Sequence, residues 1–288
     1  MTDIVRADDG RRIAVEQSGD PSGRPVFLLH GTPGSRMGPA PRGMLLYRLG
    51  IRLIAFDRPG YGGSDRLEGR DVAAAAVDVL TIAEALKLGT FALVGRSGGG
   101  PHALAAAALL PGRVTRVAAL VSLAPQGAEG LDWYEGMTES NVVEYNAAAS
   151  GVGVLETRLA PKAAAIRANP ESLISGLYQE LSPSDRQTVA DLGIRRMLVD
   201  NFAEGLKHSA YGWIDDAMAF SKPWGFDPAD IAVPTLLWHG ALDGFSPVGH
   251  ARWLADRIPD AKVIVQPGVA HFGALDILPD VLPWLVES

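Results

Sequence analysis

The sequence contains no cysteine in its 288 residues. Disulfide bonds, zinc–thiolate sites and thiol catalysis are therefore excluded. Long apolar runs are missing as well, because no stretch reaches the roughly 18 residues that a membrane-spanning helix needs. The opening residues, MTDIVRADDGRR, lack the apolar segment of a secretory signal. We therefore expect a cytoplasmic protein that has no membrane partner.

Basic residues are fewer than acidic ones. The chain has 26 Lys and Arg against 33 Asp and Glu, which gives a net charge of -7 and a pI near 5.4. This acidity argues against non-specific binding of nucleic acid. The motifs G-x-x-x-x-G-K-[ST] and H-E-x-x-H of nucleotide and zinc sites are both absent. We expect no metal, no cofactor and no nucleic-acid partner, and a monomer or homodimer that acts on a small molecule.

Short apolar runs bounded by glycine and proline recur along the chain, with segments of helical periodicity between most of them. Examples of the runs are RPVFLLHG, IRLIAFDRPG, FALVGRS, VAALVSLAP, PTLLWHG and KVIVQPG. Continuously apolar strands are typically buried on both faces, and their alternation with helices indicates a mostly parallel sheet covered by helices. The pattern therefore predicts an α/β fold.

One interval, residues 126–221, breaks this alternation. It has helical periodicity without a convincing strand, and it holds four of the six tyrosines. We interpret it as a helical cap inserted over the sheet. The expected division is a core domain of residues 1–125 and 222–288 and a cap of residues 126–221.

Three residues that follow apolar runs form a possible catalytic set. Ser97, Asp243 and His271 occur in this chain order, each just after a predicted strand, and ligands of open parallel sheets bind beyond the carboxyl ends of the strands. A serine hydroxyl needs a neighbouring base to act as a nucleophile, and histidine titrates in the suitable range. A buried carboxylate can orient the imidazole and stabilise its protonated form.

The glycines around Ser97 fit a sharp strand-to-helix turn. The spacing G-x-S-x-G places Gly95 and Gly99 where the backbones of strand and helix approach closely. The N–H of Gly98, at the start of the following helix, can point at an oxyanion. Thr32 follows an earlier strand and is expected to supply the second donor, since Pro33 has no N–H.

Five motifs in register resemble the α/β-hydrolase superfamily, in particular its capped branch of small esterases and proline iminopeptidases. They are HGTPGS, FDRPGYGGSD, GRSGGG, WHGALDGFSP and GVAHFG, and they span almost the whole chain. The resemblance implies an α/β-hydrolase fold with a helical cap. It also implies residue roles, namely the nucleophile Ser97, the base His271, the orienting acid Asp243, and an oxyanion hole made by Thr32 and Gly98.

Arg96 departs from the family pattern, which more often has an aromatic residue, histidine, glutamine or another polar residue there. We expect it either to pair with a buried acid such as Asp57 or to tune the site. The residues from Asp57 to Asp65 are otherwise explained by turn chemistry.

Other candidates for the catalytic acid and base are interpreted as structural. Asp215, Asp216 and Asp227 are expected to be surface charges of the cap or linker. His30 is expected to shape the oxyanion loop, and His102 to face either the core or the pocket. Candidate pocket residues are the cap aromatics, because aromatic side chains dominate such pockets; they are Trp133, Tyr134, Tyr211 and Trp213.

The function expected from these residues is a cofactor-free serine hydrolase. It would cleave carboxylic esters, lactones or thioesters of small apolar molecules through an acyl-enzyme on Ser97. An aminopeptidase similar to the proline iminopeptidases is one alternative, and it needs an acid for the substrate amine; the candidates are Glu135, Glu139, Glu144 and Glu204. A lyase or tailoring enzyme of natural-product metabolism, or a ligand receptor with a vestigial triad, would share the same motifs.

Overall fold

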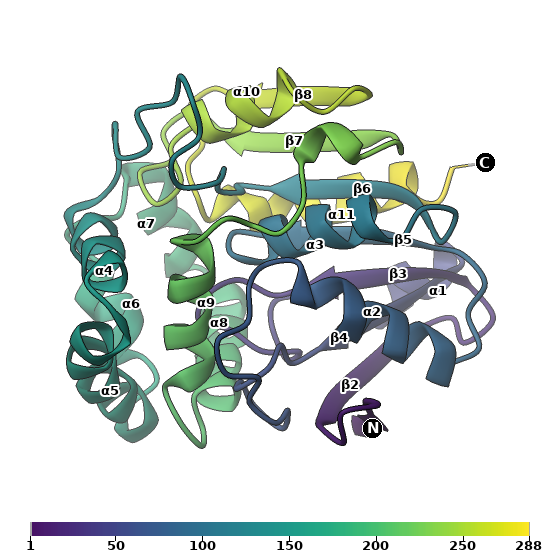
Figure 1. The fold of residues 1–288 in the computed structure, drawn as a ribbon, viewed down its shortest axis with the longest axis horizontal. Coiled ribbons are helices and arrows are strands. Elements are labelled where there is room, and N and C mark those ends of the chain that lie inside the picture. The colour runs from purple at the N-terminus through teal and green to yellow at the C-terminus, as the bar shows by residue number, and fades with distance from the viewer. Residues whose placement is uncertain (1, 288) are drawn as a thin grey trace.

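The computed structural model describes residues 2–287, which form an eight-stranded sheet flanked by helices (Figure 1). The strand order is β1-β2-β4-β3-β5-β6-β7-β8. Strand β2 is antiparallel to both of its neighbours, β1 and β4, and all other pairs are parallel. The strands are β1 Thr2–Arg6, β2 Arg12–Gly19, β3 Arg24–Leu29, β4 Ile51–Phe56, β5 Phe91–Arg96, β6 Val114–Leu120, β7 Thr235–Gly240 and β8 Ala261–Gln266. The prediction of a mostly parallel sheet is confirmed.

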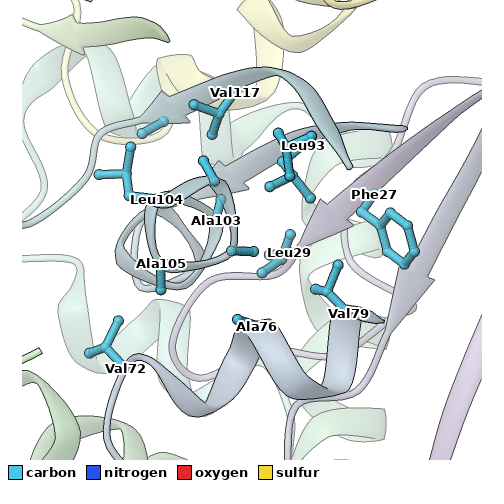
Figure 2. Close-up of a cluster of buried hydrophobic side chains, with 14 of the residues drawn as sticks. Phe27, Leu29, Val72, Ala76, Val79, Leu93, Ala103, Leu104, Ala105 and Val117 are labelled. Atoms are coloured by element: carbon cyan, nitrogen blue, oxygen red, sulfur yellow. The ribbon is translucent and has the colours of Figure 1, made fainter. Parts of the chain in front are cut away.

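The central strands bury side chains on both faces, as their continuous apolar runs predict. On β3, Phe27 and Leu29 join a core with helices on one face (Figure 2). Val26 and Leu28 join a second core on the other face. The first face is covered by α2 (Ala74–Ala85), α3 (Gly99–Leu109), the short helix η1 (Pro228–Asp230) and α10 (Gly249–Ala255). The second face is covered by α1 (Gly43–Arg48) and α11 (Gly273–Leu285).

Between β6 and β7 the described chain forms helices and no strand. We call residues 139–220, from the start of α4 to the end of α9, the helical insertion. It stands beside the sheet in Figure 1 and has an apolar core of its own. Its helices are α4 Glu139–Ala149, α5 Val152–Ala168, α6 Ser172–Leu177, α7 Pro183–Ala190, α8 Leu192–Gly205 and α9 Tyr211–Phe220.

No helix within residues 2–287 has both the length and the apolar character needed to cross a membrane.

Candidate active site

Ser97 occupies the turn between β5 and α3 in a strained backbone conformation. Its φ is 54°, in the left-handed region that residues with a side chain rarely adopt. Its N–H donates to the carbonyl oxygen of Leu120 at 2.8 Å. No side chain fits at the two flanking glycines. A Cβ at Gly95 would overlap the backbone of Gly99, and one at Gly99 would overlap the Leu29 carbonyl. The glycine spacing seen in the sequence is therefore required by close backbone approach.

His271 and Asp243 form a hydrogen-bonded pair. The Nδ1 atom of His271 lies 2.8 Å from Oδ2 of Asp243, whose side chain is buried. The carboxylate also accepts the backbone N–H groups of Phe245 at 2.8 Å and Ser246 at 3.0 Å. These bonds fix the carboxylate in the turn after β7, so that it holds the imidazole in one orientation.

The pair shifts the pKa values of both members. Burial by itself raises the pKa of Asp243, but the charge of His271 and hydrogen bonds from His239 and His271 outweigh it and hold that pKa below its usual range. Burial by itself lowers the pKa of His271, yet the attraction and hydrogen bond of Asp243, helped by Asp185, raise it above the ordinary value. Asp243 is therefore ionised at neutral pH, and His271 gains basicity from it.

Ser97 and His271 line one cavity of about 370 Å³. Thr32 and Gly98, the two expected oxyanion donors, line the same cavity. Thr32 and Gly98 are in close contact, because a Cβ at Gly98 would overlap the Thr32 hydroxyl. Within residues 2–287, Ser97 and His271 are not hydrogen-bonded to each other, and such bonds commonly form only once substrate is bound. Four of the five sequence-predicted residues thus line one cavity, and the fifth, Asp243, is hydrogen-bonded to His271.

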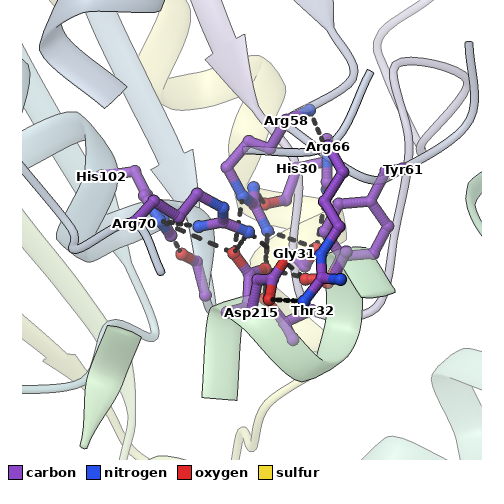
Figure 3. A network of polar contacts seen from close by, with 12 residues as sticks. His30, Gly31, Thr32, Arg58, Tyr61, Arg66, Arg70, His102 and Asp215 are labelled. Carbon is purple, nitrogen blue, oxygen red and sulfur yellow. Dashed lines mark hydrogen bonds and ion pairs between the residues drawn. The ribbon is translucent and has the colours of Figure 1, made fainter. Parts of the chain in front are cut away.

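A buried polar network holds the loop after β3, which carries Thr32, in place (Figure 3). Arg58 donates to the carbonyl oxygens of His30 and Gly31 and, at 3.0 Å, to the hydroxyl of Thr32. The Thr32 hydroxyl in turn donates to Asp216 at 2.5 Å. The loop that carries Thr32 is therefore clamped by a strand-end arginine and an aspartate of α9.

Asp216 is the centre of this network. Arg58 and Arg70 donate to its two oxygens at 2.6 Å each, and Tyr61 donates at 2.9 Å. Burial by itself raises the pKa of Asp216, but the two guanidinium groups outweigh it and hold the pKa well below its usual range. Burial, with Arg58 adding to it, lowers the pKa of the adjacent His102 to about 3, so its imidazole is neutral.

The prediction that Asp215 and Asp216 are surface charges is wrong. Asp216 has no exposed surface, and Asp215 is 4% exposed and forms a two-point ion pair with Arg66 at 2.8 and 2.9 Å. Both lie on α9, the last helix of the insertion, and their carboxylates face arginines of the loop after β4. Asp227 is exposed and caps η1 through the N–H of Ala229. The sequence analysis explained residues 57–65 by turn chemistry. It did not predict that Arg58 and Tyr61, in the same loop, bind Asp216.

A second carboxylate approaches His271 from the helical insertion. Asp185, on α7, is 2% exposed and accepts the N–H of Phe272 at 2.7 Å. Its charge contributes to the raised pKa of His271. Burial raises the pKa of Asp185 itself, against the lowering effect of His271. Nothing in the sequence singled it out, because α7 is distant along the chain from both His271 and Asp243.

Of the four aromatic residues predicted to line the pocket, only Trp213 does so. Trp133 is 4% exposed and packs edge-on against Tyr145 and His250, while its indole N–H donates to Ala124 at 2.8 Å. Tyr134 accepts a hydrogen bond from Gln126, and Tyr211 donates to Glu156. Aromatic residues that line the cavity but were not predicted are Tyr145, Phe202, Phe220, Phe245 and Phe272.

Arg96 does not pair with Asp57, as was considered from the sequence. Asp57 is bound by the guanidinium and backbone N–H of Arg36 and by the N–H of Gly63. Arg96 donates instead to the carbonyl oxygen of Pro39 at 3.3 Å and lines the cavity beside Ser97.

Residues 2–287 contain no group of three or more His, Cys, Asp or Glu side chains placed to hold a metal ion.

Comparison with known proteins places this chain in a family. A family model described as alpha/beta hydrolase fold matches residues 24–276. The chain belongs to this family. The resemblance to the α/β-hydrolase superfamily is thereby confirmed, as is the fold class. Membership of this family supports an enzyme of the hydrolase class.

Individual alpha/beta hydrolases are similar over nearly the full length. The chain is 28% identical to a non-heme chloroperoxidase of Streptomyces lividans, over 96% of this chain and 95% of that one. It is 27% identical to a non-heme haloperoxidase of Rhodococcus erythropolis, over 93% of this chain and 92% of that one. Among solved structures, an esterase of Exiguobacterium antarcticum superposes with a TM-score of 0.70 at 24% identity, covering 100% of both chains. That superposition supports the fold alone.

Proposed function

We propose that this protein is a serine hydrolase that cleaves carboxylic ester, lactone or thioester bonds of small molecules with a largely apolar body. The observation that carries the proposal is the hydrogen bond of 2.8 Å between His271 and Asp243, beside a cavity that both His271 and the strained Ser97 line. This is the arrangement that converts a serine hydroxyl into a nucleophile.

In the proposed reaction, Ser97 Oγ attacks the carbonyl carbon while His271 Nε2 takes the hydroxyl proton. Asp243, bonded to Nδ1, holds the imidazole and stabilises its positive charge. The carbonyl oxygen becomes an oxyanion and accepts the N–H groups of Thr32 and Gly98. His271 then gives the proton to the leaving alcohol or thiol, and the acyl group stays on Ser97. Water, deprotonated by His271, attacks the acyl carbon. The bond to Ser97 Oγ then breaks, the acid leaves, and Oγ recovers the proton from His271.

The cavity supports a small, mostly apolar acyl or alcohol group. Its walls combine core residues with side chains from the helical insertion; the apolar ones include Ile166, Leu177, Phe202, Trp213, Phe220 and Phe245. Because the insertion supplies much of this wall, we propose that residues 126–221 act as a cap over a core of residues 1–125 and 222–288. The cap limits the access of bulk solvent to the reaction centre and selects substrate shape.

The decisive experiment compares Ser97→Ala with the unsubstituted protein on para-nitrophenyl butyrate. We expect the turnover to fall to the uncatalysed background, with circular dichroism and the melting temperature unchanged. Ser150→Ala is the matched control, since that hydroxyl is exposed and bonds only within its own helix end. A fluorophosphonate should label the peptide that contains Ser97. Full activity of Ser97→Ala would falsify the proposal.

A second candidate, aminopeptidase activity, is favoured by Glu144. Of the four glutamates considered for binding a substrate amine, it alone lines the cavity. It accepts the indole N–H of Trp213 at 2.7 Å, and burial raises its pKa to about 7. Assays with prolyl anilides would test this candidate. Turnover of prolyl anilides exceeding that of butyrate esters, and lost in Glu144→Gln, would favour it over the esterase.

The names of the two relatives point to a third assay. If hydrogen peroxide replaces water in the attack on the acyl-enzyme, the acyl group leaves as a peracid. The peracid can then oxidise a halide ion. Bromination of monochlorodimedone with peroxide and a carboxylic acid, compared between the unsubstituted protein and Ser97→Ala, measures this reaction directly.

A further inference from the structure

Arg96 is a buried cation at the reaction centre. Arg96 is the last residue of β5 and directly precedes Ser97, and it is 8% exposed. It lines the cavity that Ser97 and His271 also line. The proposed hydrolytic reaction assigns no task to this guanidinium.

The partners of Arg96 set it apart from the other buried arginines of residues 2–287. Arg58 and Arg70 share Asp216 at 2.6 Å, so each has a carboxylate. Arg96 has none, and its single hydrogen bond runs from Nη1 to the neutral carbonyl oxygen of Pro39, at 3.3 Å. Its Nε and Nη2 groups make no hydrogen bond within the described chain.

An unpaired buried cation is costly. Removing an ion from water is unfavourable even after the protein relaxes, and proteins normally offset this cost with a counter-charge. Burial lowers the pKa of Arg96 to about 10, and no acidic group counteracts it. The guanidinium therefore stays charged at neutral pH, without an anion in the protein.

We propose that Arg96 binds a carboxylate carried by the substrate, so that the preferred molecule combines an ester, lactone or thioester with one negative charge and an apolar body. A guanidinium whose Nε and Nη2 groups are free offers one N–H edge to a planar carboxylate. One unpaired guanidinium can neutralise one negative charge of the substrate. Besides Arg96 and His271, the basic residue that lines the cavity is Lys162, which is exposed. This substrate class rests on the proposed function, whereas the anion site itself does not.

The test measures binding without turnover. Calorimetry on Ser97→Ala compares the monomethyl esters of succinate, glutarate and adipate, each with one carboxylate, with the neutral dimethyl esters. We expect at least one monomethyl ester to bind about tenfold more tightly than its dimethyl counterpart, the usual effect of a charge-assisted hydrogen bond. The preference should vanish in Ser97→Ala/Arg96→Met and persist in the matched control Ser97→Ala/Lys162→Met.

Three results would overturn the anion site: no preference for any monomethyl ester, a preference that survives Arg96→Met, or one that Lys162→Met abolishes. The melting temperature gives an independent check. Because Arg96→Met removes an unpaired buried charge, the ligand-free variant should melt no lower than the unsubstituted protein. A clearly lower melting temperature would assign Arg96 to the fold instead. Ester hydrolysis that survives Ser97→Ala would overturn the proposed function alone, and the preference for the monomethyl esters would then be measured from the KM values of the same ester pairs.

Discussion

The hydroxyl of Thr32 donates a hydrogen bond of 2.5 Å to the carboxylate of Asp216. The two residues are far apart in sequence, one in the loop after β3 and the other on α9, at the end of the helical insertion. The bond connects the insertion directly to the loop that carries a proposed oxyanion donor. A displacement of α9 would therefore move the Thr32 amide away from the developing charge.

Asp216→Asn tests this connection. The substitution removes the negative charge between Arg58 and Arg70, which leaves both guanidinium groups buried without a counter-charge. We expect the free energy of unfolding to fall by about 3 kcal/mol or more, as for other broken buried ion pairs, and kcat for para-nitrophenyl butyrate to fall with it. Urea unfolding and steady-state kinetics measure the two effects.

The neighbouring Asp215→Asn serves as the control. Asp215 pairs with Arg66, whose side chain is about a quarter exposed, so water can solvate the arginine left behind. We expect a stability loss of about 1 kcal/mol and little change in kcat. Equal losses in the two variants would argue against a special role for Asp216.

Gly98→Ala tests the contact between the two proposed oxyanion donors. The new methyl group would overlap the hydroxyl of Thr32 and push away the loop that carries Thr32. We expect kcat to fall by about a hundredfold or more, which is the effect of losing one oxyanion donor. Gly153→Ala on α5 has no atom within 4 Å of the new Cβ, and kcat should stay unchanged there. Normal kcat in Gly98→Ala would contradict the assignment.

The pH dependence of hydrolysis follows from His271. The base must be neutral to accept the serine proton, so kcat/KM decreases as the pH falls through the pKa of His271 in the free enzyme. Because Asp243 raises this pKa, the midpoint should lie above about 6.5, the ordinary value for histidine. Asp243→Asn should shift the midpoint of its residual activity to lower pH. A midpoint below that of free histidine would contradict the proposed pairing.

Asp185 should act on the same midpoint from the helical insertion. Asp185→Asn keeps an oxygen that can accept the N–H of Phe272 but removes the charge that raises the pKa of His271. We expect the acid limb of the kcat/KM profile to shift to lower pH. Asp185→Ala also removes the hydrogen bond, so it should in addition lower the free energy of unfolding by about 1 kcal/mol. An identical pH profile in Asp185→Asn would mean that its role is structural only.

The predicted positions of Ser97, Asp243 and His271 rested on strand ends, and the structure brings all three residues together. Parallel strands finish at one edge of the sheet, so residues that follow different strands approach one another without any knowledge of the loops. Gly95 and Gly99 were informative for a similar reason, because only glycine fits where two backbones touch.

The predictions for the helical insertion were less successful. Whether a residue such as Tyr211 or Phe202 faces the cavity depends on how its helix is rotated against the neighbouring helices, and composition does not specify this rotation. Asp216 was misjudged because its neutralising arginines lie in a distant loop. A single sequence carries no sign of that pairing.

The sequence by itself determined the alternation of strands and helices, the sharp turn at Ser97 and the chain order of the three proposed catalytic residues. These features depend on periodicity, glycine placement and the ends of strands, which are local properties. Only the tertiary structure decided which charges are paired. Arg58 and Arg70 converge on Asp216, whereas Arg96 is buried beside Ser97 without a carboxylate. Burial and the long-range meeting of charges arise only when the helical insertion packs against the sheet.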